Sequence, residues 1–290
     1  MRNRASRTAE QVALFRALET ARGRDRVFDD PLAVRFLPGR YRLLARLARL
    51  RPVGLRLSRM IDERWPGPRP SAVARTRLID DLVAAALAGG ARQVLLLGAG
   101  YDSRAYRLPG IARARVFEAD HPATQAVKQR LLRGAVRADR RRHVRFVPVD
   151  LLAEDLGAAL LRGGFAALEP TVVVWEGVTN YLTEAAVDAT LRRIAAITAT
   201  GSRLIFTYVD RRVLDGGFPD AMRWHDAVGR VGEPWTFGFD PAGLAAYLAE
   251  RGLRLAADLS TRDAADRYLR PLGRDEAAAG FYRVAEAEIQ

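Results

Sequence analysis

Acidic side chains follow four short apolar runs of this chain, and the first run ends in a glycine loop. Gly98-Ala99-Gly100 comes directly after Gln93–Leu97, and Asp120 closes the second run about twenty residues further on. Asp150 and Glu176 follow the third and fourth runs. Glycine lets the backbone approach a ligand, and a carboxylate after the next strand accepts hydrogen bonds from ribose hydroxyls. The glycines alone could form a simple strand-to-helix turn, but the whole pattern predicts an adenosine-containing ligand.

The charge of these side chains indicates which adenosine compound would bind. A dinucleotide site has a third glycine and a helix N-terminus open to pyrophosphate, whereas Asp102-Ser103 follows the loop here. Carboxylates repel pyrophosphate and attract a ligand that carries an ammonium and a sulfonium group. Asp150 adds an acceptor for an adenine amino group, and Glu176 adds a negative charge near the cationic end. The sequence therefore predicts S-adenosyl-L-methionine rather than a nicotinamide cofactor.

Composition excludes several other kinds of site. The 290 residues include no cysteine, which excludes a disulfide scaffold, a cysteine nucleophile and thiolate metal sites. The three histidines, His121, His143 and His225, are far apart and form no ligand pattern, so we expect no metal site. His225 is the only histidine in the late part of the chain that should form an acceptor pocket, and a lone histidine is more often structural.

The net charge of +13 is concentrated near the start of the chain. Residues 1–80 contain 19 basic and 8 acidic side chains, and the remainder is almost balanced. Of the 47 basic residues, only Lys128 is lysine. Together with the many alanines, this indicates a compositional bias rather than a surface evolved for a polyanion, although the basic N-terminus permits one. We therefore do not expect nucleic acid as a partner.

Strand-like and helix-like patterns alternate from residue 92 onward. The expected strands are Gln93–Leu97, Arg115–Ala119, Val144–Val149, Thr171–Trp175 and Arg203–Val209. The expected helices between them are Pro122–Arg133, Leu156–Leu161 and Glu184–Ala199. This alternation predicts an α/β fold with a mostly parallel, doubly wound sheet. After a looser stretch that contains Gly and Pro, we expect a helix over Pro241–Arg251 and strands over Leu253–Ala257 and near Phe281–Ala287.

The first ninety residues predict helices with Pro- and Arg-rich joints. Helices are expected over Thr8–Ala21, over Tyr41–Leu50 and from about Ser71 to Leu87, with a helix start at Asp29-Asp30-Pro31 and a break at Pro52. The predicted organisation is an N-terminal helical cap or lid over residues 1–90 and a ligand-binding catalytic domain over residues 91–290.

Tyr41–Leu50 interleaves leucine with arginine, so it could lie on a membrane or on an acidic partner. A packed helix with a solvated arginine face is the more frequent explanation for such a pattern, and we favour it. Nothing in the sequence has the apolar core of a signal peptide or the length of a membrane span. We accordingly expect a cytoplasmic protein with no membrane partner.

Several motifs together resemble the leucine carboxyl methyltransferase family, including its bacterial branch of S-adenosyl-L-methionine-dependent O-methyltransferases. The similarity extends over about residues 10–260, and its motifs occur in order and at matching spacing. They are Phe28–Ala33, Ala74–Asp81, Leu97–Arg104 with Tyr106–Leu108, Phe117–Pro122 with Lys128, Asp150-Leu151, and Trp175–Leu182. The resemblance implies a class I methyltransferase fold: a Rossmann-like doubly wound sheet with an N-terminal helical lid and an antiparallel C-terminal strand.

The resemblance also implies roles for individual residues. Arg75 would contact the methionine carboxylate of the cofactor, which a guanidinium suits. Gly98 would lie under the methionine moiety and Asp120 would bind the ribose. The adenine would be held by Asp150 and Leu151, and Glu176 would face the methionine amino group. Arg75 could instead pair with Asp80 on its own helix.

The methyl acceptor is harder to predict. Transfer from a sulfonium requires alignment, and a carboxylate acceptor is already ionised, whereas a hydroxyl acceptor needs a base. The scarcity of bases and the resemblance both favour methyl-ester formation on a small metabolite or natural product, with hydroxyl O-methylation as the alternative. Tyr181 is the candidate for orienting the acceptor oxygen. The candidate acceptor-pocket residues are Trp224, His225, Trp235 and Phe237.

Two other function classes remain. Nucleic-acid methylation is disfavoured because Asn180-Tyr181-Leu182 lacks the N-P-P-aromatic loop that resemblance to amino-group methylases would require. A non-catalytic adenosine-binding module is disfavoured because an unused site has no need of buried charge. The oligomeric state is not predicted.

Overall fold

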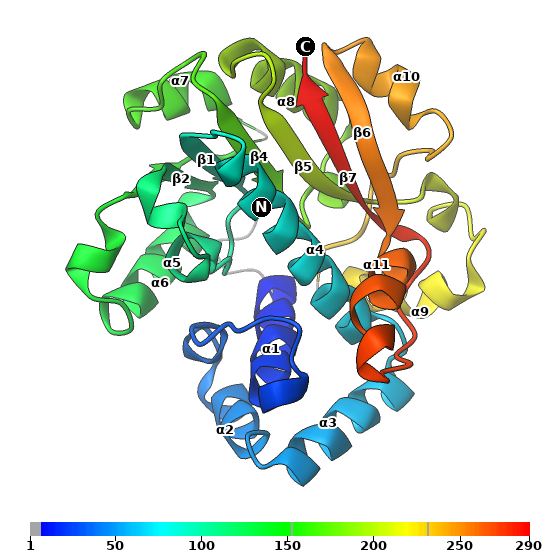
Figure 1. The fold of residues 1–290 in the computed structure, drawn as a ribbon. Coiled ribbons are helices and arrows are strands. Elements are labelled where there is room, and N and C mark those ends of the chain that lie inside the picture. The colour runs from blue at the N-terminus through cyan, green and yellow to red at the C-terminus, as the bar shows by residue number, and fades with distance from the viewer. Residues whose placement is uncertain (1–6, 152, 231) are drawn as a thin grey trace.

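A seven-stranded sheet runs through the protein in the order β3-β2-β1-β4-β5-β7-β6 (Figure 1). The computed structural model describes residues 7–151, 153–230 and 232–290. The strands are β1 (Gln93–Leu97), β2 (Arg115–Asp120), β3 (Val144–Pro148), β4 (Thr171–Trp175), β5 (Arg203–Val209), β6 (Leu253–Ser260) and β7 (Tyr282–Ile289). Strands β1 to β5 pair in parallel, and β7 pairs antiparallel with both β5 and β6. The expected doubly wound sheet and antiparallel C-terminal strand are confirmed.

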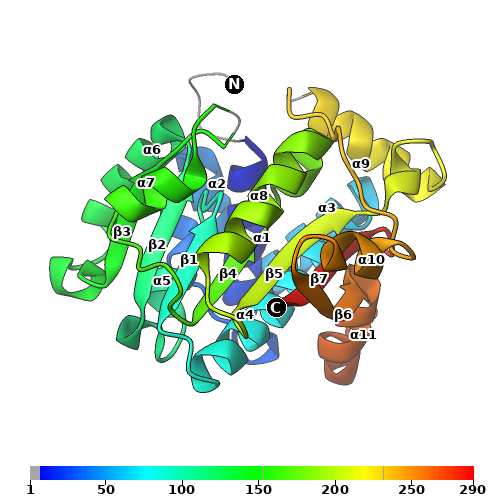
Figure 2. The same cartoon turned by 90° about the horizontal axis from the view of Figure 1, so that it is seen from above.

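The central strands are apolar because helices cover them on both faces. Every residue of β1 and β4 is buried. On one face, α7 (Leu156–Arg162), α8 (Glu184–Ile197) and α10 (Leu244–Ala249) pack against the sheet. On the other face, α4 (Pro68–Ala88) and α11 (Thr261–Tyr268) form the second layer, and Figures 1 and 2 show both arrangements. The result is a three-layer α/β structure.

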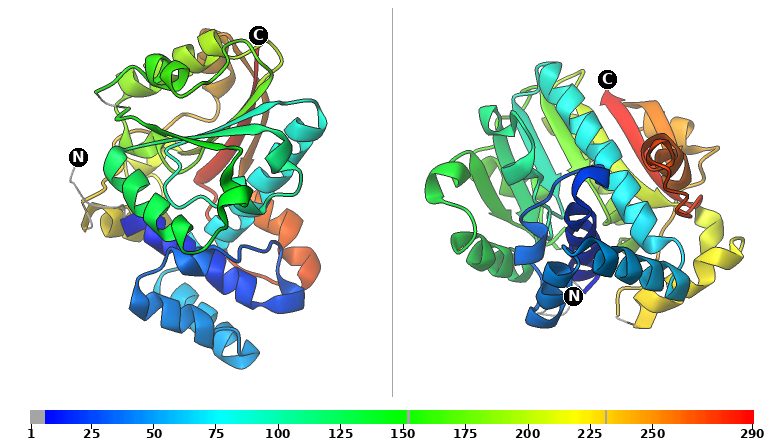
Figure 3. Two further views of the ribbon diagram at one scale, coloured as in Figure 1. Left: turned by 90° about the vertical axis from the view of Figure 1, so that its left-hand side faces the viewer. Right: turned by 60° about the horizontal axis from the view of Figure 1, so that its bottom comes forward.

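The remaining helices surround one end of the sheet. They are α1 (Arg7–Ala21), α2 (Gly39–Leu47), α3 (Arg51–Arg64), α5 (Arg104–Arg107), α6 (Pro122–Arg133) and α9 (Pro219–Arg230). Helices α1 and α2 share a small core with α6 through Ala13, Ala45 and Leu132. Figure 3 shows α2 and α3 at the end of the molecule away from the sheet. No helix in the described ranges has both the length and the hydropathy to cross a bilayer.

The expected division at residue 90 remains a prediction. Helix α4 belongs to the first ninety residues, yet its side chains Val73, Ile79 and Val83 pack in the same core as Val94 of β1. The covalent path from the N-terminal helices to β1 therefore runs through a helix that forms part of the sheet's own covering layer.

The structure corrects several expected element boundaries. The helical break expected at Pro52 occurs between Leu47 and Arg51, and Pro52 itself lies in the first turn of α3, where proline lacks only an amide that would be unpaired anyway. Helix α9 replaces part of the expected loose stretch after Asp210, and α11 was not expected at all. The helix expected over Pro241–Arg251 is limited to α10. Asp29-Asp30-Pro31 does mark a helical start, because the Asp30 carboxylate accepts the Ala33 amide at 3.0 Å, but the turn covers only Ala33–Arg35.

The expected packing of Tyr41–Leu50 is right in part: the helix packs on the protein and Arg46 and Arg49 are exposed, but the leucines are not buried. A packed amphipathic helix would bury its leucines and expose its arginines, but Leu43, Leu44, Leu47 and Leu50 are all exposed. The side chains that α2 and the following turn bury are Ala45 and Ala48. The helix therefore rests on the protein through Ala45 and Tyr41, and its leucines face outward.

The strand order reverses between β1 and β4, and this reversal positions the site. The chain moves outward from β1 through β2 to β3 and then returns to place β4 on the other side of β1. The loops after β1 and β4 therefore separate at the carboxyl edge of the sheet and leave a crevice, which is where open α/β sheets bind ligands.

Candidate functional site

A cavity of about 690 Å³ opens at the carboxyl ends of β1 to β4. This volume lies within the range of roughly 300–1,000 Å³ that small-molecule sites occupy. The structure brings the seven residues predicted for the cofactor to its wall, although they come from four strand ends and one helix. They are Arg75, Gly98, Gly100, Asp120, Asp150, Leu151 and Glu176.

The glycine loop after β1 requires glycine at its first position. Gly98 has φ +67°, a conformation that other residues rarely adopt. A Cβ atom there would stand 2.3 Å from Cγ2 of Val178, which follows β4. Two loops of the crevice thus approach each other at this point, and a side chain on Gly98 would push them apart. The absence of a side chain at Gly98 therefore keeps these two loops in close contact in the cavity wall.

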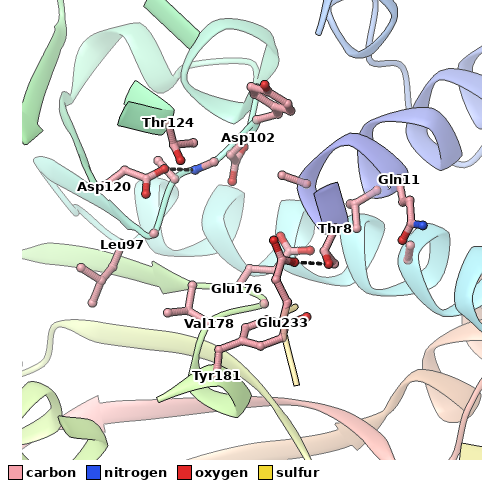
Figure 4. A pocket seen from close by; sticks show the side chains of 18 of the residues that line it. Thr8, Gln11, Leu97, Asp102, Asp120, Thr124, Glu176, Val178, Tyr181 and Glu233 are labelled. Atoms are coloured by element: carbon pink, nitrogen blue, oxygen red, sulfur yellow. Dashed lines mark hydrogen bonds between the residues drawn. The ribbon is translucent and has the colours of Figure 1, made fainter. Parts of the chain in front are cut away.

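Asp120 is aimed into the cavity by the backbone around it. Its carboxylate accepts the Gly100 amide at 2.6 Å and the His121 amide at 2.7 Å, and Figure 4 shows the first of these bonds. Burial raises the pKa of Asp120, against the effect of these two hydrogen bonds. Its remaining lone pairs suit the hydroxyl donors of a ribose.

Glu176 and Arg75 form an ion pair in the cavity wall. Nε of Arg75 lies 2.8 Å from Oε1 of Glu176, and the Arg75 guanidinium lies over the Tyr282 ring. Nη1 of Arg104 contacts Oε2 of the same carboxylate at 2.6 Å. Burial alone would raise the pKa of Glu176, but Arg104 and Arg75 outweigh it and lower this pKa to about 2. Glu176 is therefore ionised at every physiological pH, and Arg75 does not pair with Asp80.

Arg104 connects this ion pair to a buried network that sequence reasoning missed. Its guanidinium also contacts Asp102 at 2.6 Å and Asp80 at 2.7 Å, and Asp80 in turn pairs with Arg107. The network continues to α1, where Arg16 pairs with Asp30 at 3.0 Å. The partners are up to 101 residues apart in sequence, so no local spacing could have revealed them.

The network corrects one step of the sequence argument. From the sequence, the carboxylates of Asp102 and Glu176 are expected to repel pyrophosphate and attract a cationic ligand. Both share the Arg104 guanidinium instead, and burial opposed by Arg104, Lys128 and Arg16 leaves the pKa of Asp102 well below its usual range. The cavity wall thus contains ionised carboxylates whose negative charge is offset by the buried Arg104 guanidinium. They can orient an ammonium group, but they repel an anion less than expected.

A second buried ion pair, Lys128 with Glu118, packs against the glycine loop. Nζ of Lys128 on α6 lies 2.7 Å from Glu118 of β2, and both side chains are 1% exposed. The same ammonium donates to the Ala99 carbonyl at 3.4 Å, inside the loop. The only lysine of the chain is therefore a packed structural cation directly behind the cavity wall.

The other half of the cavity is aromatic. Tyr181, Trp224 and Trp235 line it, and Trp224 stacks on Tyr282 with centroids 5.5 Å apart. Burial, helped by Tyr282, raises the pKa of Tyr181 to about 12, so its phenol stays protonated. This half offers a flat apolar surface and a hydroxyl donor, which suits an acceptor with an apolar body.

Two residues predicted for the acceptor pocket lie outside the cavity wall. Phe237 is buried in the core beneath the sheet, against Phe239 at 4.8 Å between centroids. His225 is half-buried, with its ring 5.9 Å from that of Trp235. Both side chains therefore pack behind residues of the cavity wall and do not face the cavity.

Helix α1 and the segment before Trp235 meet over the cavity. The Thr8 hydroxyl of α1 donates to the Glu233 carboxylate, and both residues line the cavity beside Tyr181 (Figure 4). Gln11, Phe15 and other residues of α1 extend this wall. Sequence reasoning did not assign any of these residues. Across the described residues, no cluster of three or more possible metal ligands occurs.

Comparisons with known proteins identify sequence relatives of the chain. The sequence model described as leucine carboxyl methyltransferase matches residues 9–195. A protein of Frankia alni, named as a candidate S-adenosyl-L-methionine-dependent methyltransferase, is 38% identical over 267 residues, or 91% of this chain and 87% of that protein. A Streptomyces avermitilis protein with the same description is also 38% identical, over 91% of this chain and 88% of its own length.

Solved structures share the fold. A DUF574 family protein from Streptomyces avermitilis has a TM-score of 0.60 at 16% identity, over 95% of this chain and 97% of that chain. A methyltransferase candidate from Thermobifida fusca has a TM-score of 0.58 at 16% identity, over 95% and 94% of the two chains. At such identities the similarity concerns the fold alone.

Proposed function

Because the chain belongs to the leucine carboxyl methyltransferase family, we propose that it forms a methyl ester on the carboxylate of a small metabolite or natural product. The coarser activity is established by family and relatives: the protein is an S-adenosyl-L-methionine-dependent methyltransferase with a class I, Rossmann-like fold. The cytoplasmic location, the small-molecule acceptor and the absence of a nucleic-acid partner, all expected from the sequence, remain parts of the proposal.

When bound, the cofactor supplies an electrophilic methyl group on a sulfonium. We assign the ribose to Asp120, the adenine to Asp150 and Leu151, the space under the methionine moiety to Gly98 and Gly100, and its two charged ends to Arg75 and Glu176. The fit rests on the oriented Asp120 carboxylate and on the paired charges of Arg75 and Glu176 in the same cavity wall. Transfer of this methyl group would form a carbon–oxygen bond to the acceptor as the carbon–sulfur bond breaks, and the electron pair of that bond would stay on sulfur. The products are the ester and S-adenosylhomocysteine.

The observation that favours a carboxylate acceptor is the lack of an imidazole or phenolate base at the aromatic end. Among the described lining residues, the only histidine is His121, and its Nδ1 accepts the Ala123 amide at the start of α6. Tyr181 is protonated because its pKa is about 12, so it donates to the acceptor rather than removing a proton. A carboxylate is ionised at neutral pH and needs no base. The role of Tyr181 is to orient its oxygen.

The test uses tritiated methyl groups and a panel of carboxylic acids, each paired with the corresponding alcohol. Methyl esters release volatile tritiated methanol in mild alkali, whereas methyl ethers do not. We expect incorporation that alkali releases. Incorporation that resists alkali would contradict carboxyl methylation.

Hydroxyl methylation is the second candidate, and one residue could serve it. The Glu233 carboxylate lies at the aromatic end near Tyr181, where it could accept a hydroxyl proton. Glu233→Gln keeps the size of the side chain and removes the base. An acid acceptor should keep most of its turnover in this variant, whereas an alcohol acceptor should lose roughly 10²–10⁴-fold. Thr8→Val, which removes the hydrogen bond from the other side, serves as the control for packing.

A further inference from the structure

Helices α2 and α3 expose apolar and basic side chains on one surface, which we call the α2–α3 surface (residues 39–64). Eleven large apolar side chains are exposed in the described chain, and seven of them lie between residues 43 and 60. Four are leucines of α2 and the turn after it, and Leu43 and Leu50 are 59% and 60% exposed. Val53, Leu55 and Met60 add three more on α3. Such a concentration of exposed apolar groups marks an interaction surface.

The fold does not use these side chains. Within α2 the buried residue is Ala45, and within α3 it is Ser58. Both helices protrude at the end of the molecule farthest from the sheet (Figure 3). The surface is therefore carried on two helices whose fully buried residues are small, and seven of their large apolar side chains or those of the turn between them point outward.

The same surface is strongly basic. Residues 39–64 contain eight arginines and two carboxylates, Asp62 and Glu63, so they carry about half of the net charge of +13. Within the described ranges, Arg46, Arg49 and Arg59 are exposed and have no carboxylate partner. Asp62 is not available to offset them, because it pairs with the buried Arg69.

Against the expectation of no membrane partner, we propose that the α2–α3 surface docks on a lipid bilayer that carries anionic headgroups. Leucine side chains between arginines form the pattern of a helix that lies in a membrane interface: the apolar groups enter the acyl boundary and the guanidiniums stay with the phosphates. A protruding pair of helices can enter a fluid interface without a complementary groove. A second copy of this chain fits poorly, since it would bring eight further arginines against the first eight.

The test is co-sedimentation of the full chain with vesicles. One preparation contains phosphatidylcholine alone, and the other contains about one-third phosphatidylglycerol. We expect binding to the anionic vesicles, at least about tenfold weaker binding to the neutral ones, and weaker binding as salt increases. No binding to the anionic vesicles would overturn the proposal.

Two matched pairs of variants separate this surface from overall charge and hydrophobicity. Arg46→Glu/Arg49→Glu should weaken vesicle binding about tenfold or more, whereas Arg140→Glu/Arg162→Glu makes the same change in net charge at other exposed arginines and should have little effect. Leu43→Ser/Leu47→Ser should also weaken it, unlike Leu161→Ser/Leu168→Ser. Unfolding temperature and affinity for S-adenosylhomocysteine verify that each variant is folded.

Three results would contradict the proposal even if the wild type binds. Equal losses in both arginine variants would mean that net charge alone drives binding. Unchanged binding in Leu43→Ser/Leu47→Ser would mean that no apolar insertion occurs, as expected for a site that takes an acidic protein. A dimer in sedimentation velocity that this leucine variant dissociates would assign the surface to a second copy. None of these outcomes bears on the methyl-transfer proposal.

Discussion

At the scale of single residues, Asp120 allows a direct test of cofactor binding. Asp120→Asn keeps the shape but removes the charge that accepts hydrogen bonds from the ribose. We expect S-adenosylhomocysteine affinity to fall by about 1.5–3 kcal/mol, or roughly 10–150-fold, by calorimetry. Asp139→Asn changes an exposed carboxylate and is the control. Unchanged affinity in Asp120→Asn would remove this residue from the site.

The same residue predicts a pH dependence. Burial raises the pKa of Asp120 in the free protein. The ionised form binds the hydroxyls, so affinity is complete above that raised pKa and is lost as pH falls through it. Because Glu176 has a pKa of about 2, it does not contribute to this loss. Asp120→Asn should remove the dependence, and the same acid profile in wild type and variant would assign it to another group.

Lys128 predicts a stability effect. Lys128→Met leaves Glu118 as a buried charge without its partner, which costs about 3–5 kcal/mol in the free energy of unfolding. Adding Glu118→Gln should recover much of that loss, because the uncompensated charge disappears. Arg137→Met breaks an exposed pair and should change stability little. Denaturant unfolding measures all three, and a Lys128→Met variant as stable as Arg137→Met would refute the buried pair.

At the scale of elements, the loops after β1 and β4 are coupled through one close contact. Gly98→Ala combines a positive φ with a Cβ atom 2.3 Å from Val178, so both stability and S-adenosylhomocysteine affinity should fall. Adding Val178→Ala removes the clash and should recover part of both. Gly134→Ala at the end of α6 has negative φ and open space, and should be neutral. Failure of Val178→Ala to recover anything would place the cause elsewhere than in this contact.

Strands buried on both faces and helices with a clear start between them were predictable, whereas two polar helices, α3 and α11, were not. β1, β4, β5 and α6 have the bounds that the sequence predicts, because burial on two faces or a proline start leaves few alternatives. Helix α11 was missed although Ser260 and Asp263 form a capping box in front of it. Helix α3 was missed because Pro52 was interpreted as a stop instead of a first-turn residue.

The site residues also differ in how far the sequence predicts them. Asp120 and Glu176 lie at predictable strand ends, so topology brings them to one crevice. The Arg104 network and the α1 wall depend on contacts between segments far apart in the chain, and no periodicity encodes them. Residue type alone points to His225 and Phe237 as acceptor-pocket residues. Tertiary packing places both behind the cavity wall.

At the scale of the whole molecule, the N-terminal helices and the sheet form one ligand site. Thr8, Gln11 and Arg16 of α1 line the same cavity as Asp120, so a bound cofactor should tighten α1. We expect S-adenosylhomocysteine to slow amide hydrogen exchange over residues 8–21 and to leave residues 51–64 unchanged. Unchanged exchange over residues 8–21 would contradict a lid function for this helix.

Every site role assigned above requires that the carboxyl edge of β1 to β4 binds a sulfonium cofactor rather than a dinucleotide. Calorimetric titration with S-adenosyl-L-methionine, S-adenosylhomocysteine and NAD, side by side, tests this most directly. We predict micromolar binding of the first two compounds and no binding of NAD. Binding of NAD alone would contradict both the assignment of Asp120, Arg75 and Glu176 and the activity derived from them.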